Sequence, residues 1–345
     1  MRNSERDIYI VIVHVGCLMK MNRIVLNKTN KREAGNFLLF VFLLPYVCAC
    51  LWGHVGEETR QIVSDKKEIQ QAEAVYKVEA VMDWGIWELP MEEYLIYRLA
   101  LVMPRGYAEE AMKAQAVLLR TELVSSYRET GSRVLRVEES GLNRFYGNGQ
   151  KEDILSDCRK AVEETEGFYL VYRGEPVQAS YFKVSNGHTR DAGEVWHTDG
   201  CPYLAGVSCE QDKASTEYSS VVNVEKKRYI ELLRTRAGND YQEDTLWQGG
   251  LFSFDTAGYI TEVVYTEEGK EEIRIDGEDF RHLFGLNSAA VEMERNEENM
   301  LFHVKGVGHG FGMSQYGANC RALNGERYDQ ILKEFFLGTE LAKFE

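Results

Sequence analysis

The most informative segment of the chain reads Gly306-Val307-Gly308-His309-Gly310-Phe311-Gly312-Met313-Ser314-Gln315-Tyr316-Gly317-Ala318. Glycines alternate with larger residues over its first half. Because glycine has no Cβ, such a run allows tight turns and lets a ligand lie close to the backbone. The segment is not a phosphate-binding loop, since it lacks the lysine and the glycine spacing of that motif. Its imidazole, hydroxyl and amide groups suit an uncharged, hydroxyl-rich ligand such as a glycan.

Several segments upstream belong to the same pattern. They are Leu89–Leu95, Met103-Pro104, Glu110–Thr121, Ala179–Phe182, Ser185–Thr189 and Gly277–Ala290. Together with the C-terminal segment, and in this order, they resemble the stage II sporulation protein D family, which also includes the amidase-enhancer proteins. The resemblance extends over residues 80–340. It implies a sporulation-related protein that binds and remodels the glycan strands of peptidoglycan outside the cytoplasm.

The resemblance also implies a catalytic chemistry. Members of the sporulation branch are lytic transglycosylases, which cleave the glycan strand without water and leave an anhydro-sugar end. One carboxyl group serves both proton transfers, whereas hydrolases usually need two. In the family this glutamate stands directly before Met-Pro, and here that residue is Val102. Valine transfers no proton, and general acid–base catalysis is typically worth ~10² to 10⁴ in rate, so the substitution puts cleavage in question.

Three functional alternatives follow from Val102. The chain is a glycan-binding homologue that has lost cleavage, or an active lytic transglycosylase with a relocated glutamate, or a scaffold that regulates a separate cell-wall amidase or hydrolase. Glu92, Glu93, Glu109 and Glu110 are the nearby acids, and Glu93 and Glu110 are the fallback catalytic candidates. Both also match ordinary positions of the family pattern, where an acid at a helix N-terminus has a structural role.

Seven side chains are candidates for substrate contact. They are His309, Ser314, Gln315, Tyr316, Ser185, Gln115 and Arg120. Hydroxyl and amide groups suit sugar hydroxyls, which favours Ser314 and Gln315. For His309, a ligand contact and a ring that fixes the glycine loop are equally open interpretations. Tyr316 is expected to pack with its hydroxyl at the cleft edge. The two candidates on the predicted long helix either line the groove or are ordinary solvated or ion-paired residues.

The charge is unevenly distributed along the 345 residues, whose formal net charge is −15. Such an acidic chain is not a generic nucleic-acid binder.

Residues 1–33 are basic, with the first 20 open to interpretation as a start-site artefact, and 34–55 contain the apolar run Phe37–Trp52. This order predicts a cytoplasmic leader and then a transmembrane signal anchor over 34–55 in a single-pass protein of the cell membrane. A buried core helix is the alternative. Residues 56–78 predict a polar stalk, which leaves 79–345 as one domain outside the cytoplasm.

Metal and cofactor sites are not expected. Some members of the sporulation branch carry a Cys/His zinc site after the first long helix, but the corresponding region here, Ser140–Gln150, has neither residue type. Four cysteines follow the predicted anchor, namely Cys158, Cys201, Cys209 and Cys320. An exported domain permits a disulfide, with Cys201 and Cys209 as the nearest pair, and free buried thiols are the alternative.

Periodicity and turn signals predict mixed secondary structure in the domain. Expected helices are 91–101, 108–128, 225–235, 318–324 and 328–336, and expected strands are 168–172, 177–184, 251–265 with a break at Ala257-Gly258, and 271–275. Helices and strands do not alternate regularly. The sequence therefore favours an α+β fold, with helices packed on antiparallel β structure, over a doubly wound sheet.

Overall fold

Most buried side chains of the domain fall into two clusters, one built largely from helices and one built around two antiparallel sheets. The computed structural model describes residues 76–145, 152–237 and 241–344. Residues 75–345 form one compact unit. The predicted leader and anchor, and the predicted stalk up to residue 75, lie outside the described residues.

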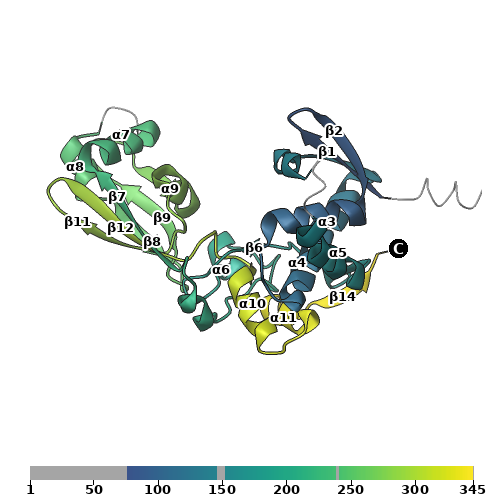
Figure 1. The fold of residues 1–345 in the computed structure, drawn as a ribbon. Helices are drawn as coiled ribbons and strands as arrows, with labels where there is room; N and C mark the ends of the chain where they lie inside the picture. Colours follow the sequence, from purple (N-terminus) through teal and green to yellow (C-terminus); the bar gives the residue numbers. More distant parts are fainter. Residues whose placement is uncertain (1–75, 146–151, 238–240, 345) are drawn as a thin grey trace, which may run out of the picture. The chain divides into compact units, whose positions relative to one another are not determined.

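The first cluster is centred on a long helix. Its N-terminal elements are β1 (Lys77–Met82), β2 (Gly85–Pro90), α3 (Met91–Val102), α4 (Glu109–Thr130), β3 (Val134–Glu138), the 3-10 helix η1 (Ser140–Arg144) and α5 (Glu152–Glu164). The sheet has the order β2-β1-β3, in which β1 is antiparallel to β2 and parallel to β3. Figure 1 shows α3, α4 and α5 packed together beside this sheet.

Helix α4 is buried on most sides, which explains its alanine-rich sequence. Ala111, Ala114 and Ala116 are fully buried, and these small side chains let α3, α5, α10 and α11 pack close to the helix. Gly131 ends α4 in a left-handed conformation with φ +64°. The predicted long helix is therefore confirmed, and it extends two residues beyond the expected end at Arg128.

The remaining elements around α4 come from distant parts of the chain. They are β4 (Phe168–Tyr172), β5 (Glu175–Pro176), β6 (Tyr181–Phe182), α6 (Ala192–Trp196), η2 (Glu210–Ala214), β13 (Met313–Ser314), α10 (Gln315–Leu323), α11 (Tyr328–Phe335) and β14 (Glu340–Lys343). Strands β14, β4 and β5 form one sheet, and β6 pairs with β13 in parallel. This parallel pair places the C-terminal signature directly beside residues 181–182.

The predicted strand 177–184 is wrong as a continuous element. Only Glu175–Pro176 and Tyr181–Phe182 pair with other strands. Between them the backbone N–H of Gln178 donates to the Tyr203 hydroxyl (2.9 Å), and the N–H of Ser180 donates to the Gln178 carbonyl (2.9 Å). These bonds divert the backbone from the sheet, so the β-rich composition of this segment does not produce one strand.

The second cluster holds two antiparallel sheets and three helices. Its elements are β7 (Ser219–Glu225), α7 (Lys226–Ala237), α8 (Glu243–Gln248), β8 (Leu251–Phe254), β9 (Ile260–Tyr265), β10 (Ile273–Asp276), α9 (Gly277–Phe284), β11 (Val291–Arg295) and β12 (Asn299–Lys305). The sheet orders are β11-β12-β7 and β10-β9-β8. Tyr229, Phe284 and Phe302 stack at its centre, with Tyr229 and Phe284 ring centroids 4.9 Å apart.

The α+β class predicted from the sequence is confirmed by these elements. Two parallel pairs, β1–β3 and β6–β13, depart from the expected antiparallel β structure. Among the helices that the structure describes, none has the length and apolar character needed to cross a bilayer. The predicted anchor over 34–55 is not among these residues.

Candidate functional site

The signature loop, defined here as Gly306–Gly317, packs so closely against other segments of the chain that several of its positions accept only glycine. Gly306, Gly308, Gly310 and Gly312 all have positive φ, between 74° and 114°. A Cβ on Gly308 would lie 2.6 Å from the Cβ of Phe182, and one on Gly310 would lie 2.8 Å from the Tyr259 ring. The alternating glycines therefore reflect close contact with neighbouring protein segments rather than room for a ligand at the backbone.

A buried carboxylate that the sequence analysis did not single out holds the end of this loop. The hydroxyl of Ser314 donates to Oδ2 of Asp212 (2.6 Å), and the backbone N–H of Ser185 donates to the same oxygen (2.7 Å). All three residues are fully buried. Ser314 also caps α10, because its hydroxyl oxygen accepts from the N–H of Gly317 (3.1 Å). Ser185 and Ser314 thus have internal partners, and a direct sugar contact from either stays a prediction.

Burial dominates the electrostatics of Asp212. It raises the pKa of this carboxyl above its ordinary value, although the hydrogen bonds from Ser314 and Ser185 partly oppose the effect. Its second oxygen, Oδ1, has no hydrogen-bond partner among the described residues. Asp212 therefore holds Ser314 and Ser185 in place by accepting their hydrogen bonds. The protonation state of its carboxyl affects the stability of the fold.

Gln315 joins the signature loop to Val102, the residue directly before Met103-Pro104. Its side-chain amide donates to the backbone carbonyl of Val102 and to the side-chain carbonyl of Gln115, both at 3.1 Å. Gln115 is fully buried, Gln315 is 2% exposed and Val102 is half-buried at the end of α3. Nε2 of Gln115 has no acceptor within the described part of the chain. The structure thus brings together three of the sequence-predicted positions, from α3, α4 and α10.

His309 is held by the loop in a defined tautomer. Its Nδ1 accepts the N–H of Phe311 (3.1 Å), so the neutral ring carries its proton on Nε2. Burial lowers the pKa of His309. The imidazole is therefore neutral at pH 7, and its Nε2–H donates to the backbone carbonyl of Tyr181. Both ring nitrogens thus have partners within the chain, and a ligand contact from His309 stays a prediction.

Tyr316 is half-buried, and its backbone N–H donates to the carbonyl of Lys183 (3.0 Å). Its hydroxyl lies against the thiol of Cys320, and burial raises the pKa of this hydroxyl. The role of Tyr316 at a cleft edge stays a prediction. Cys158, Cys201, Cys209 and Cys320 are all free thiols, so the Cys201–Cys209 disulfide considered from the sequence is not formed.

Arg120 lies away from the signature loop, in the interior of the first cluster. Its guanidinium is fully buried and forms two hydrogen bonds with the carboxylate of Glu92, at 2.7 and 2.6 Å. It also donates to the backbone carbonyl of Phe168 (3.0 Å). Bidentate arginine–carboxylate pairs are among the strong hydrogen-bonded contacts in proteins. Arg120 therefore ties α4 to α3 and β4, and none of its described partners belongs to the loop.

The fallback acids occupy structural or solvent-exposed positions. One oxygen of Glu110 accepts from the N–H of Tyr328 at the start of α11 (2.8 Å), and the other accepts from Lys113 (2.8 Å). Glu93 is exposed on α3. Within the described residues, no hydrogen bond or ion pair links either carboxylate to Val102 or to the signature loop.

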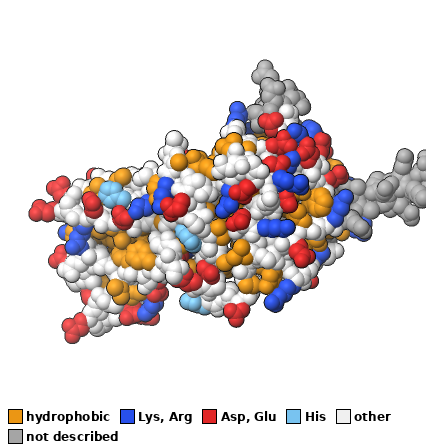
Figure 2. Space-filling view, turned by 90° about the horizontal axis from the view of Figure 1, so that it is seen from below, with side chains coloured by type: hydrophobic (Ala, Val, Ile, Leu, Met, Phe, Trp, Pro, Cys, Tyr) orange, Lys and Arg blue, Asp and Glu red, His pale blue; other side chains and the backbone are white. Residues whose placement is uncertain are grey.

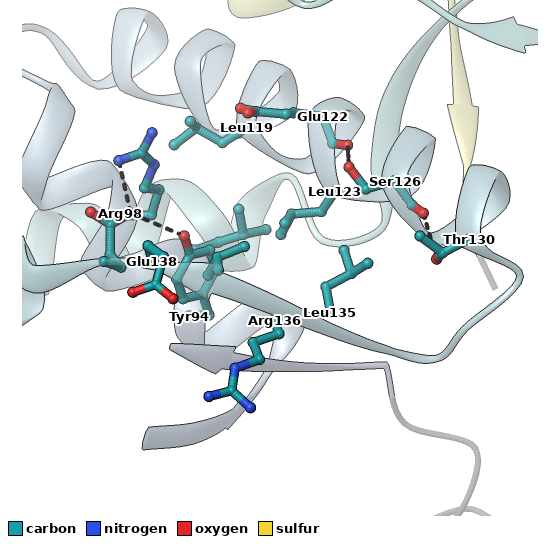
Figure 3. Close-up of a pocket in the computed structure, with 13 residues that line it drawn as sticks. Tyr94, Arg98, Leu119, Glu122, Leu123, Ser126, Thr130, Leu135, Arg136 and Glu138 are labelled. Carbon is teal, nitrogen blue, oxygen red and sulfur yellow. Dashed lines mark hydrogen bonds and ion pairs between the residues drawn. The ribbon is translucent and has the colours of Figure 1, made fainter. Parts of the chain in front are cut away.

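A cavity of 380 Å³ lies along the same helix as Val102 (Figure 3). Its walls come from α3, α4 and β3, and Glu122 and Arg98 are among the charged residues that line it. Within it, Oε2 of Glu139 accepts from Arg98 (2.9 Å) and from the Tyr94 hydroxyl (3.2 Å). Burial raises the pKa of Tyr94, so this phenol is a donor at neutral pH. The Glu139 carboxylate is thus engaged by two donors.

The face shown in Figure 2 and the titratable groups of the described residues bear on what a nucleic-acid or metal site requires. Figure 2 shows acidic and basic side chains interspersed over the face that it presents, with apolar side chains between them. Within residues 76–145, 152–237 and 241–344, no group of three His, Cys, Asp or Glu side chains is arranged to hold a metal ion. Part of the predicted metal-free segment, residues 146–150, lies outside these ranges.

Known proteins similar to this chain come from bacterial cell-wall and sporulation families. A family model described as stage II sporulation protein matches residues 84–172. The chain is 31% identical over 308 residues to the stage II sporulation protein D of Bacillus amyloliquefaciens, with 84% of each chain covered. It is 29% identical over 331 residues to the Bacillus subtilis (strain 168) protein of the same name, covering 88% of this chain and 92% of that one. An amidase enhancer of Bacillus subtilis (strain 168) is 26% identical over 286 residues, covering 70% of this chain and 39% of the relative.

Proposed function

The chain belongs to the stage II sporulation protein D family, and on this premise we propose that it acts on the cell wall during sporulation by binding the glycan strands of peptidoglycan. In this proposal it takes part in wall remodelling without cleaving the strand itself. The domain works outside the cytoplasm, held at the cell membrane by one helix over residues 34–55.

The observation that carries the proposal is the setting of Val102. Gln315 and Gln115 form a buried amide pair around its backbone. Nε2 of Gln115 has no acceptor among the described residues, and buried amide groups are normally hydrogen-bonded, so in this proposal a carboxylate at residue 102 would accept from it. On this premise the polar surroundings of a catalytic acid remain while the acid is absent. Polar residues that could bind the glycan strand, without a carboxyl group to donate a proton, favour binding of the strand over its cleavage.

A relocated acid has little support in this structure. A general acid must reach the glycosidic oxygen with a proton to give. Glu110 is committed to the start of α11 and to Lys113. Glu139 accepts hydrogen bonds from Arg98 and from the Tyr94 hydroxyl, so its carboxylate is already engaged within the chain.

The ligand contacts in this proposal come from neutral groups. His309 contributes a neutral ring and Tyr316 a neutral phenol at the margin of the loop. Neutral aromatic and phenol groups suit the ring faces and the hydroxyl and acetamido groups of a glycan. Ser185, Ser314, Gln115 and Gln315 support these contacts by fixing the loop.

A cell-wall hydrolase is the protein partner that we propose. The support is the similarity to a relative named amidase enhancer. Binding the strand without cleaving it would let this chain hold the substrate for a separate amidase.

The experiment is a parallel test of binding and cleavage. Full-length protein is incubated with insoluble peptidoglycan and with purified glycan strands. Sedimentation measures binding, and mass analysis of muropeptides detects anhydro-sugar ends. We expect the protein to sediment with the wall and to release no anhydro ends above the blank. Release by the wild-type chain would contradict the loss of cleavage, and absence of both binding and release would favour the partner-binding role alone.

A further inference from the structure

An aromatic stack begins inside the signature loop and ends at an exposed tryptophan. The ring of Phe311 contacts the rings of both His309 and Trp196, with centroid separations of 6.0 Å and 4.7 Å. His309 also contacts Phe182, with ring centroids 5.7 Å apart. Phe311 is 5% exposed, whereas Trp196 is 37% exposed. Trp196 is therefore the end of the stack that a ligand can reach, and the sequence analysis did not identify it.

A buried arginine packs against the Phe311 ring of the stack. The guanidinium of Arg190 lies 4.7 Å from the ring centroid of Phe311 and 5.2 Å from that of Tyr259. It is neutralised by an ion pair with Asp255, and it donates to the backbone carbonyl of His309 (3.4 Å). A desolvated cation against a ring face contributes attraction beyond packing. Phe311 is thus held in place whether or not a ligand is present.

The short helix that carries Trp196 is fixed independently of the stack. Asp191 caps α6 by accepting from the N–H of Glu194 (3.0 Å). The carboxylate of Glu194 in turn accepts from the N–H and the hydroxyl of Thr256, at 2.9 and 2.6 Å. At the other end, His197 adopts a left-handed conformation with φ +51°. Because both ends of α6 are constrained, the indole of Trp196 is already ordered before a ligand binds. Little conformational entropy is therefore lost on binding.

We propose that Trp196 is a stacking platform for one pyranose ring of a glycan strand, a subsite that rests on the proposed glycan binding and extends it along the signature loop. The C–H groups on the apolar face of a hexosamine ring lie against the electron-rich face of the indole. The hydroxyl or acetamido groups at the ring edge remain free for polar contacts. The His309 ring, two ring contacts away from Trp196, faces the adjoining part of the same strand. The ligand class is therefore a β-linked N-acetylhexosamine chain that is bound through its neutral hydroxyl and acetamido groups.

The test uses the full-length protein and soluble N-acetylglucosamine tetramers, with glycan strands freed of stem peptides as a second probe. Titration calorimetry compares the wild type with Trp196→Ala and Trp196→Phe. Trp84→Ala is the matched control, because Trp84 is 51% exposed at the β1–β2 turn, outside the stack. We expect Trp196→Ala to weaken binding about 10-fold, Trp196→Phe to weaken it less, and the control to bind as the wild type does.

Two further readouts keep the outcomes distinct. The indole fluorescence that is lost in Trp196→Phe is expected to shift when the wild type is saturated with the tetramer, which tests contact even if Trp196→Ala folds poorly. Unchanged affinity in a folded Trp196→Ala, or no shift at saturation, would overturn the platform while leaving glycan binding intact. Failure of the wild type to bind either probe would contradict the proposed function and the platform together.

Discussion

The side-chain amide of Gln315 donates a hydrogen bond to the backbone carbonyl of Val102, 213 positions earlier in the chain, at 3.1 Å. The same amide reaches Gln115 on α4. The C-terminal signature is therefore in direct contact with the residue before Met103-Pro104, the position at which an acid is expected from the resemblance. This contact makes residue 102 part of the loop's surroundings.

The pH dependence of stability is expected to carry a contribution from Asp212. Its folded-state pKa lies above the ordinary carboxyl value of about 4. The folded state therefore holds the proton more tightly than the unfolded chain, and the free energy of unfolding falls as the pH rises from about 4 through the raised pKa. Asp212→Asn keeps an acceptor for Ser314 and removes this pH dependence. Urea unfolding at several pH values measures the effect, with exposed Asp199→Asn as the control. Identical pH profiles for wild type and Asp212→Asn would contradict the assignment.

Alanine at Gly312 should destabilise the chain by more than backbone strain alone. A Cβ there would overlap the carbonyl oxygen of Ser180, which accepts the N–H of Met313 (3.0 Å). Gly325 has a comparable φ of +91°, but a Cβ there meets nothing within 4 Å. We expect Gly325→Ala to cost about 1 kcal/mol and Gly312→Ala to cost ~2 kcal/mol or more beyond that. Thermal unfolding compares the two, and equal losses would show that the loop is not tightly packed.

Loss of Arg120 should unfold the domain rather than weaken glycan binding selectively. Removing it leaves the carboxylate of Glu92 without its bidentate partner, and breaking a buried pair typically costs about 3–5 kcal/mol. The exposed pair Lys183–Glu217 is the control, for which Lys183→Ala should cost less than about 1 kcal/mol. Denaturant titration measures both. An Arg120→Ala variant of wild-type stability with impaired glycan binding would restore the groove role considered from the sequence.

Glycan binding should be insensitive to pH near neutrality and weaken in acid through His309. Burial places the folded-state pKa below the ordinary value of about 6.5, so the ring stays neutral down to that pH and beyond. Protonation then removes Nδ1 as the acceptor for the N–H of Phe311. Since the unfolded chain takes up this proton first, stability also falls as the pH drops through 6.5. Binding isotherms from pH 8 to 5 test this, and His309→Gln should lose the acid-side decline. A decline that begins above pH 7 would show that the ring is not held neutral.

Local sequence signals predict the helices well because their causes are local. Apolar spacing and small residues define α4, and Gly131 marks its end. Ser314 immediately before α10 is a cap signal that would have placed the helix start at Gln315. The strand expected over 177–184 fails because the Tyr203 hydroxyl, a distant partner, captures the N–H of Gln178.

The site was harder to derive because its partners lie far apart in the chain. Asp212 is separated by 102 positions from Ser314, and no motif surrounds it. Arg120 matches a family segment, but only the fold reveals that Glu92 occupies its guanidinium. Trp196 became a candidate only through its ring contact with Phe311, and no sequence pattern links these two residues. The role of residue 102 stays a prediction, since it rests on the family resemblance of the residues around Met103-Pro104.

Replacement of Val102 by glutamate is the most direct test of the account. Wild type, Val102→Glu and Val102→Gln are incubated with peptide-free glycan strands, and anhydro-sugar ends are counted by mass spectrometry. We predict none above the blank for the wild type and Val102→Gln, and release by Val102→Glu at least ~10²-fold above them, the usual lower range of acid–base catalysis. Release by the wild type at the rate of Val102→Glu would contradict the claim that the missing acid at residue 102 is what silences cleavage.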